Sequence, residues 1–73
     1  MFCIMNENNT EFLCVNTENG SRHWMTEKEI WGSLEDHEFQ IFWKIKFKTK
    51  LEALNFCEAD PSVGMNIVQD PIW

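Results

Sequence analysis

Apolar and polar residues alternate along residues 38–50, and this alternation constrains the fold more than any other feature of the sequence. Successive side chains of a β-strand point to opposite faces, so a period of two predicts one long strand with one buried face. Only Phe42 breaks the pattern. The predicted buried set is Phe39, Ile41, Trp43, Ile45 and Phe47, and Glu38, Gln40, Lys44, Lys46 and Lys48 lie between its members.

Most of the positive charge of the chain lies in or directly after this predicted strand. Four of its six Lys and Arg residues are Lys44, Lys46, Lys48 and Lys50. Lysines on an exposed edge strand hinder its pairing with another chain. We therefore expect an edge strand whose lysines cover its solvent face.

A helix is predicted directly after the strand, over about residues 50–59. Thr49 and Glu52 have the T-x-x-E spacing of a capping box, in which each side chain accepts a hydrogen bond from the backbone at the other residue. The helix is expected to end at Asp60, because the residue before Pro61 avoids the α conformation. Helical spacing turns one apolar set inward, namely Leu51, Leu54, Cys57 and Phe56.

The N-terminal segment predicts a β-hairpin of residues 2–7 against residues 10–15. Asn8 and Asn9 both tolerate the positive φ of a two-residue turn. Both faces of the hairpin are apolar, which is typical of strands covered on two sides. This register places Cys3 opposite Cys14, within reach of a disulfide. In a reducing cytoplasm we expect free, largely buried thiols instead.

Shorter elements complete the predicted fold. Residues 22–25 (RHWM) indicate a third strand, and residues 65–69 (MNIVQ) a last one. Thr26 and Glu29 form a second capping box, which predicts a short helix to about Trp31 that stops at Gly32. The chain is thus expected to be a single α+β domain, residues 1–73, with a small antiparallel sheet of about four strands and one main helix packed on one face. The main helix does not bury all of the apolar surface of this sheet. The rest is expected to be buried by other segments of the chain, by a second copy of the chain or by another protein.

Composition limits the classes of partner. A formal charge of −6 disfavours nucleic acid and anionic membranes as direct ligands, since both select basic surfaces. The longest apolar runs are far shorter than the roughly 20 residues of a membrane-spanning helix. We expect a cytoplasmic protein that binds neither nucleic acid nor membrane directly.

Catalytic and metal-binding patterns are weak. Cys14, His23, His37 and Asp36 have the chemistry of a nucleophile, base and orienting group, but no catalytic motif surrounds them. The three glycines do not have the spacing of a phosphate loop, and the Cys and His residues lack the paired spacing of zinc sites. We therefore expect a protein that is not an enzyme and has no cofactor and no metal.

The start of the predicted helix carries a family resemblance. The pattern F-x-T-x-x-E-A-x-x-F, formed by Phe47, Thr49, Glu52, Ala53 and Phe56, resembles the strand-to-helix element of small orphan accessory proteins of tailed bacteriophages. The resemblance spans about half of the chain, and residues 29–38 (EIWGSLEDHE) lengthen the connection before that element. It implies a non-enzymatic anti-defence factor in the bacterial cytoplasm that inhibits or redirects a host protein. It assigns no binding residue.

The charge pattern predicts where such a partner would bind. Acidic residues crowd the connection before the lysine-bearing strand, with Trp31 as an aromatic anchor among them. Carboxylates steer association with a basic groove, such as one that normally holds nucleic acid, and a desolvated Trp supplies affinity. The predicted partner-binding residues are Glu27, Glu29, Trp31, Glu35, Asp36, Glu38 and Phe42.

Two other interpretations of the same pattern stay open. The acidic connection packs near the basic strand so that the two screen each other, and has no ligand. Alternatively, the chain is a small structural protein that forms a homodimer and has no host target.

Overall fold

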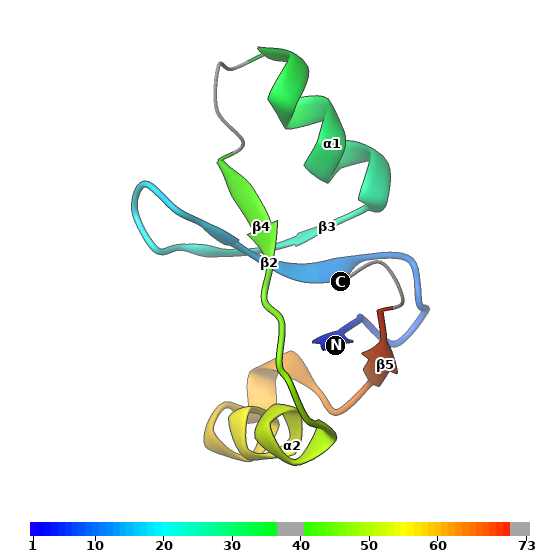
Figure 1. Cartoon of the computed structure of the whole chain (residues 1–73). Coiled ribbons are helices and arrows are strands. Elements are labelled where there is room, and N and C mark those ends of the chain that lie inside the picture. The colour runs from blue at the N-terminus through cyan, green and yellow to red at the C-terminus, as the bar shows by residue number, and fades with distance from the viewer. Residues whose placement is uncertain (37–40, 71–73) are drawn as a thin grey trace.

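The strands of the protein lie between two ten-residue helices (Figure 1). The computed structural model describes residues 1–36 and 41–70, without the side chains of residues 33–36. Helix α1 contacts β3 and β4, and helix α2 contacts β1 and β5. The elements in chain order are β1 (Phe2–Ile4), β2 (Phe12–Asn16), β3 (Arg22–Met25), α1 (Glu27–Asp36), β4 (Phe42–Lys44), α2 (Lys50–Ala59), the 3-10 turn η1 (Pro61–Val63) and β5 (Ile67–Gln69).

The predicted α+β class with antiparallel strands is confirmed, but the strands form two sheets. One sheet has the order β3-β2-β4, and the other pairs β1 with β5. All of these pairings are antiparallel. The prediction of a single sheet of about four strands was therefore wrong.

The predicted N-terminal hairpin exists only at its turn. Met5 pairs with Phe12 in the predicted register. Asn9 has a positive φ of 56° but Asn8 does not, so the turn differs from the predicted two-residue turn, which requires a positive φ at both positions. Beyond this bridge the strands separate, because β3 and β4 occupy both edges of β2 and β1 pairs with β5 instead. Cys3 therefore lies opposite Val68 and not opposite Cys14. All three cysteines are free and buried, as predicted.

Within residues 41–50, the predicted long strand consists of the three residues of β4 and one bridge between Phe2 and Phe47. Ile45 and Phe47 pack against the core, as their alternation predicts. Trp43, on the same face, lies beyond that core and is 48% exposed. Of the predicted buried set, Phe39 lies outside the described residues.

The capping box of α1 forms in full, whereas in that of α2 Glu52 accepts from the N–H of Lys48 (3.3 Å) in place of Thr49. The N–H of Glu29 donates to Thr26 Oγ1 (3.1 Å) and the N–H of Thr26 to Glu29 Oε1 (3.0 Å). Helix α1 continues past Gly32 to Asp36, so the predicted stop at Gly32 was wrong. A glycine inside a helix costs only about 1 kcal/mol relative to alanine, which the rest of the helix offsets.

The main helix has the predicted limits of residues 50–59, and Thr49 caps it by accepting from the N–H of Glu52 (3.2 Å). Its most buried residues are Ala53 and Cys57, one helical turn apart, while Leu51 is 66% exposed. The prediction that Leu51 faces inward was wrong, because the contact face is set by the 53/57 pair. The core comprises Ile4, Leu13, Cys57 and Val63, with Trp24, Ile45, Phe47, Phe56 and Ile67 packed against it.

A partly buried ion cluster lies on the α1 side of β4, and we call its four residues Lys44, Asp70, Glu27 and Lys46 the Lys44 cluster. Lys44 Nζ lies 2.6 Å from Glu27 Oε2 and 3.2 Å from Asp70 Oδ2. It also lies 4.0 Å from the centre of the Phe12 ring. Only 8% of the Lys44 side chain is exposed, so its prediction as a solvent-facing residue was wrong.

The Lys44 cluster joins segments that are distant in sequence. Among the residues that the structure describes, Asp70 is the one charged residue that is buried, and its N–H donates to the carbonyl of Met1 (2.8 Å). Burial acts to lower the pKa of Lys44, but hydrogen bonds to Glu27 and Asp70 outweigh it and raise that pKa above its ordinary value. The ammonium is therefore held charged inside the protein.

Replacing both members of the Lys44–Asp70 pair should cost less than the sum of the two single replacements, because each single change leaves the other charge without its nearest counterion. We expect Lys44→Met to lower the free energy of unfolding by about 3 kcal/mol, because the Asp70 carboxylate loses its nearest counterion. The double variant Lys44→Met with Asp70→Leu should lose less than the sum of the two single losses. Urea denaturation of the four proteins measures this coupling. Strictly additive losses would contradict the expected coupling. If both single variants fail to fold and the double variant folds, that result would support the coupling.

Candidate protein-binding surface

Helix α1 brings together three of the predicted binding residues, Glu27, Glu29 and Trp31, which we call the α1 surface. The backbones of Glu35 and Asp36 continue the same helix, but their side chains lie outside the description, and Glu38 lies outside the described residues. Phe42 lies on β4, half-buried, with its ring edge-on to His23 at 5.5 Å between centroids. Phe42 is two strand positions from Lys44 and therefore lies on the same face of β4 as Lys44, which contacts Glu27 of α1.

Glu27 connects the α1 surface to the Lys44 cluster. One of its carboxylate oxygens contacts Lys44, and the other accepts a hydrogen bond from Trp31 Nε1 (2.9 Å). Partial burial acts to raise the pKa of Glu27, but the bonds from Lys44 and Trp31 outweigh it, and the pKa lies below its ordinary value. Glu27 thus positions its neighbours, with both carboxylate oxygens already engaged.

Trp31 is the exposed apolar member of the surface. Its side chain is 45% exposed, although the hydrogen bond to Glu27 fixes the indole nitrogen. The two residues are four positions apart, which places them on adjacent turns of one helix face. An exposed ring held in this way loses little further freedom when a partner covers it.

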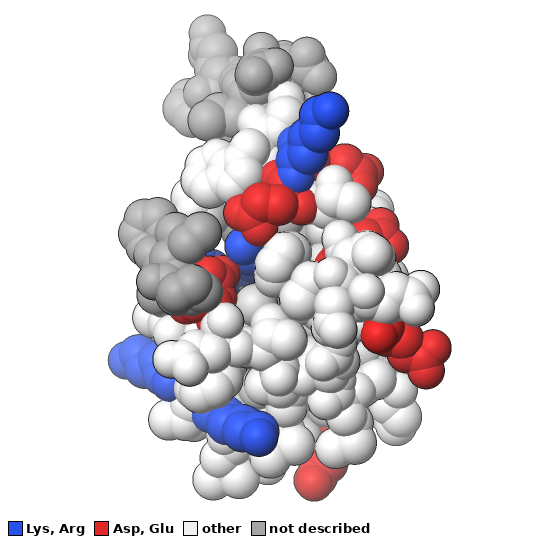
Figure 2. Space-filling view, turned by 90° about the vertical axis from the view of Figure 1, so that its right-hand side faces the viewer, with Lys and Arg blue, Asp and Glu red and all other residues white. Residues whose placement is uncertain are grey.

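Glu29 has a structural role and also leaves negative charge on the surface. Its bond from the backbone of Thr26 lowers its pKa, because that donor favours the ionised carboxylate. In Figure 2 acidic side chains are spread from the upper part of the face to its lower edge, and basic side chains lie both near its top and at its lower left. The pKa values of Glu27 and Glu29 both lie below the ordinary value, but only Glu27 lies on the helix face of Trp31, because residues two positions apart do not share a face.

The residues considered for catalysis do not form a reactive site in the described part of the chain. Burial raises the pKa of Cys14 to about 12, so its thiol is protonated at neutral pH. His23 lies opposite Cys14 in the sheet, but its Nε2 contacts Ser21 Oγ at 2.7 Å. His37 lies outside the described residues, as does the side chain of Asp36. No group of three or more Cys, His, Asp and Glu residues suited to a metal ion is found in the described residues.

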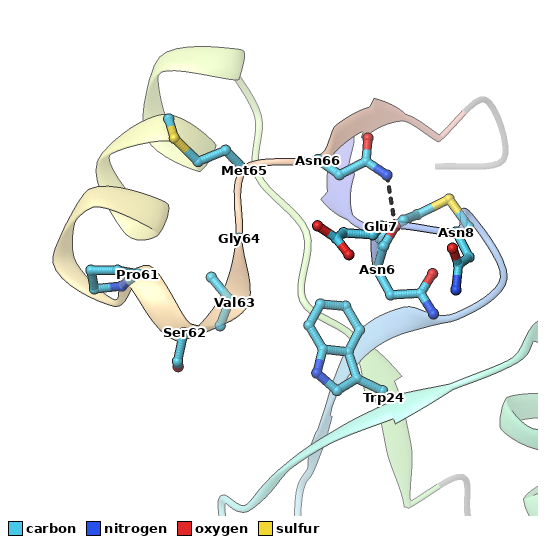
Figure 3. Close-up of a pocket in the computed structure, with 11 residues that line it drawn as sticks. Asn6, Glu7, Asn8, Trp24, Pro61, Ser62, Val63, Gly64, Met65 and Asn66 are labelled. Carbon is cyan, nitrogen blue, oxygen red and sulfur yellow. Dashed lines mark hydrogen bonds between the residues drawn. The ribbon is translucent and has the colours of Figure 1, made fainter.

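A second surface feature, not predicted from the sequence, is a pocket of about 490 Å³ that we call the Trp24 pocket. Its walls come from the turn between β1 and β2, from Trp24 on β3 and from the loop between η1 and β5 (Figure 3). These segments are far apart in sequence, and no local motif marks them. The lining residues are Met5, Asn6, Glu7, Asn8, Trp24, Pro61, Ser62, Val63, Gly64, Met65 and Asn66.

Comparisons with protein-family models, with curated proteins and with solved structures found no significant match. Within residues 1–36 and 41–70, neither helix has the length and apolar character needed to cross a membrane.

The link between Glu27 and Lys44 should make stability depend on pH in the acidic range. The pKa of Glu27 lies below 4.5 in the folded protein, so its stabilising effect is complete above that pH and is lost as the pH falls through the folded-state pKa. We expect Glu27→Gln to cost about 1 kcal/mol at pH 7 and less at pH 3, because the pair is partly exposed. Urea denaturation at both pH values tests this.

A matched control is available on the other side of the sheet. Glu18 is exposed in the turn between β2 and β3, so Glu18→Gln should leave stability unchanged at both pH values. A loss for Glu27→Gln that is the same at pH 3 as at pH 7 would show that the charge of Glu27 does not stabilise the fold.

Proposed function

We propose that this protein is a non-enzymatic binding protein that docks its α1 surface on a basic region of another protein. The observation that carries the proposal is Trp31, a large apolar side chain that is 45% exposed and yet held in place by Glu27. Tryptophan is enriched among the residues that contribute most to protein–protein affinity.

The charge of the protein supports a basic partner. The net charge is −6, and the carboxylate of Glu27 lies beside Trp31 on one face of α1. Such a charge accelerates association with a positive groove and disfavours acidic competitors. The contact of Glu27 with Lys44 is retained on docking, and Glu29 adds exposed negative charge to the same helix outside the face of Trp31.

The biological setting of the proposal rests on the resemblance to phage accessory proteins. In that setting the partner is a host defence or nucleic-acid-handling enzyme of the bacterial cytoplasm, and docking on its basic groove inhibits it. A partner groove that normally binds DNA or RNA would make the two ligands compete.

The alternative function is that of a homo-oligomeric structural protein. It is favoured by exposed apolar side chains away from α1, among them Trp43 (48% exposed) and Leu51 (66% exposed). Such side chains are suited to burial against a second copy of the chain.

Substitution of Trp31 tests the proposal, with Trp43 as the matched control. The tagged protein is used to capture partners from bacterial lysate after nuclease treatment, and the captured protein is purified and titrated by calorimetry. We expect Trp31→Ala to weaken binding by about thirtyfold or more, since a central Trp contributes about 2 kcal/mol or more. Trp43→Ala should bind like the wild type, because adjacent strand positions point to opposite faces and Lys44 is the residue that faces α1.

The outcomes separate the two functions. Equal binding by the Trp31→Ala and wild-type proteins would remove the α1 surface as the docking site. Recovery of the bait alone, with a dimer that Trp43→Ala converts to a monomer, would establish the homo-oligomeric alternative.

A further inference from the structure

The Trp24 pocket has rigid walls. Asn6 Oδ1 accepts hydrogen bonds from the backbone N–H groups of Thr10 (2.9 Å) and Glu11 (3.1 Å), which fixes the turn between β1 and β2. Asn66 Nδ2 donates to the carbonyl of Asn6 (2.8 Å) and so ties that turn to the opposite wall. The pocket is therefore already formed in the unbound protein.

The opposite wall depends on a glycine. Gly64 ends η1 with φ of 75° and ψ of −162°, a combination that is essentially restricted to glycine. Its N–H donates to the carbonyl of Pro61 (3.1 Å), which closes the turn. This turn holds Ser62 and Val63 at the rim of the pocket (Figure 3).

The lining has the charge and shape of a site for a cation. Of the described residues that line the pocket, none is Lys, Arg or His, and Glu7 is the one that carries a charge. Figure 3 shows the Glu7 carboxylate directed toward the Val63 and Gly64 loop, with the Trp24 ring beside the same hollow. A carboxylate next to an indole ring attracts cations through both ion pairing and the cation–π interaction.

Glu7 has no other role in the described structure. It is exposed, and no hydrogen bond or ion pair joins it to another described residue, in contrast to Asn6 and Asn66 in the same walls. Trp24 is half-buried, with part of its ring packed against the core. The Glu7 carboxylate is thus available to pair with a charged ligand, and the Trp24 ring provides a fixed apolar wall of the pocket.

We propose that the Trp24 pocket binds a guanidinium or alkylammonium group, with the cation between the Glu7 carboxylate and the Trp24 indole. The volume of about 490 Å³ is within the range of about 300 to 1,000 Å³ that small-ligand sites have. The net charge of −6 raises the local concentration of cations. The inference does not rest on the proposed function, because Trp24 and α1 lie on opposite faces of the β3-β2-β4 sheet.

Two model ligands of the same shape test the requirement for positive charge. N-acetyl-arginine amide and N-acetyl-citrulline amide differ in that citrulline replaces the guanidinium by a neutral urea group. Each is titrated into the isotope-labelled full chain, and the amide and indole resonances of the pocket residues are followed by NMR. We expect saturable shifts with the arginine compound and at least about fivefold weaker binding with the citrulline compound, the effect of one charged contact.

Substitution of Glu7 tests its assigned role. Glu7→Gln keeps the shape of the side chain and should weaken binding of the arginine compound by about fivefold. The control Glu18→Gln removes the same charge from an exposed turn outside the pocket, and should bind like the wild type. Thermal unfolding of both variants verifies that the fold is intact.

The source of the cation is distinguished by a peptide, Gly-Ser-Arg-Ser-Gly. Tighter binding of the peptide than of N-acetyl-arginine amide would identify a protein side chain as the ligand, and equal binding would identify a small free cation. The proposal is overturned if the pocket resonances do not shift, if citrulline binds as tightly as arginine, or if Glu7→Gln leaves the affinity unchanged. None of these results depends on Trp31, so failure of the pocket proposal would not count against the proposed role of the α1 surface.

Discussion

The buried pair of Lys44 and Asp70 is the interaction on which the arrangement of the chain depends. A charge removed from water is stable only with a close counterion and further hydrogen bonds. Lys44 lies on β4, Asp70 follows β5 and Glu27 begins α1, so satisfying one ammonium fixes the relative positions of three segments. Apolar packing alone would tolerate more than one arrangement of such short strands, whereas the ion pairs of Lys44 with Asp70 and Glu27 restrict that arrangement.

The same pair reaches the surface through a series of contacts. The carboxylate of Glu27 binds both Lys44 and the indole nitrogen of Trp31. The charge of Lys44 therefore orients the exposed ring through Glu27. This gives a small domain an ordered contact residue without a larger core to support it. The surface proposed for binding and the stability of the fold are therefore linked through one carboxylate.

Sequence patterns gave correct predictions where the interactions join residues that are close in sequence. Thr26 and Thr49 cap their helices as predicted, and Asn9 takes the left-handed conformation of its turn. The alternation of residues 38–50 shows which side chains share a face, but it cannot show which face the rest of the chain covers, and Lys44 is buried because α1 and Asp70 cover its side. The Trp24 pocket was missed for the same reason, since its walls meet only in the folded chain.

The bond from the Asp70 N–H to the Met1 carbonyl brings the beginning of the chain and its last described strand to one place (Figure 1). A ribosome delivers the chain from its N-terminus, so β2, β3, α1 and β4 emerge before Asp70 does. Until then, Lys44 has only the partly exposed Glu27 as a close carboxylate, and β1 lacks its strand partner. The buried counterion of Lys44 and the strand partner of β1 are therefore the last parts of the described fold to leave the ribosome.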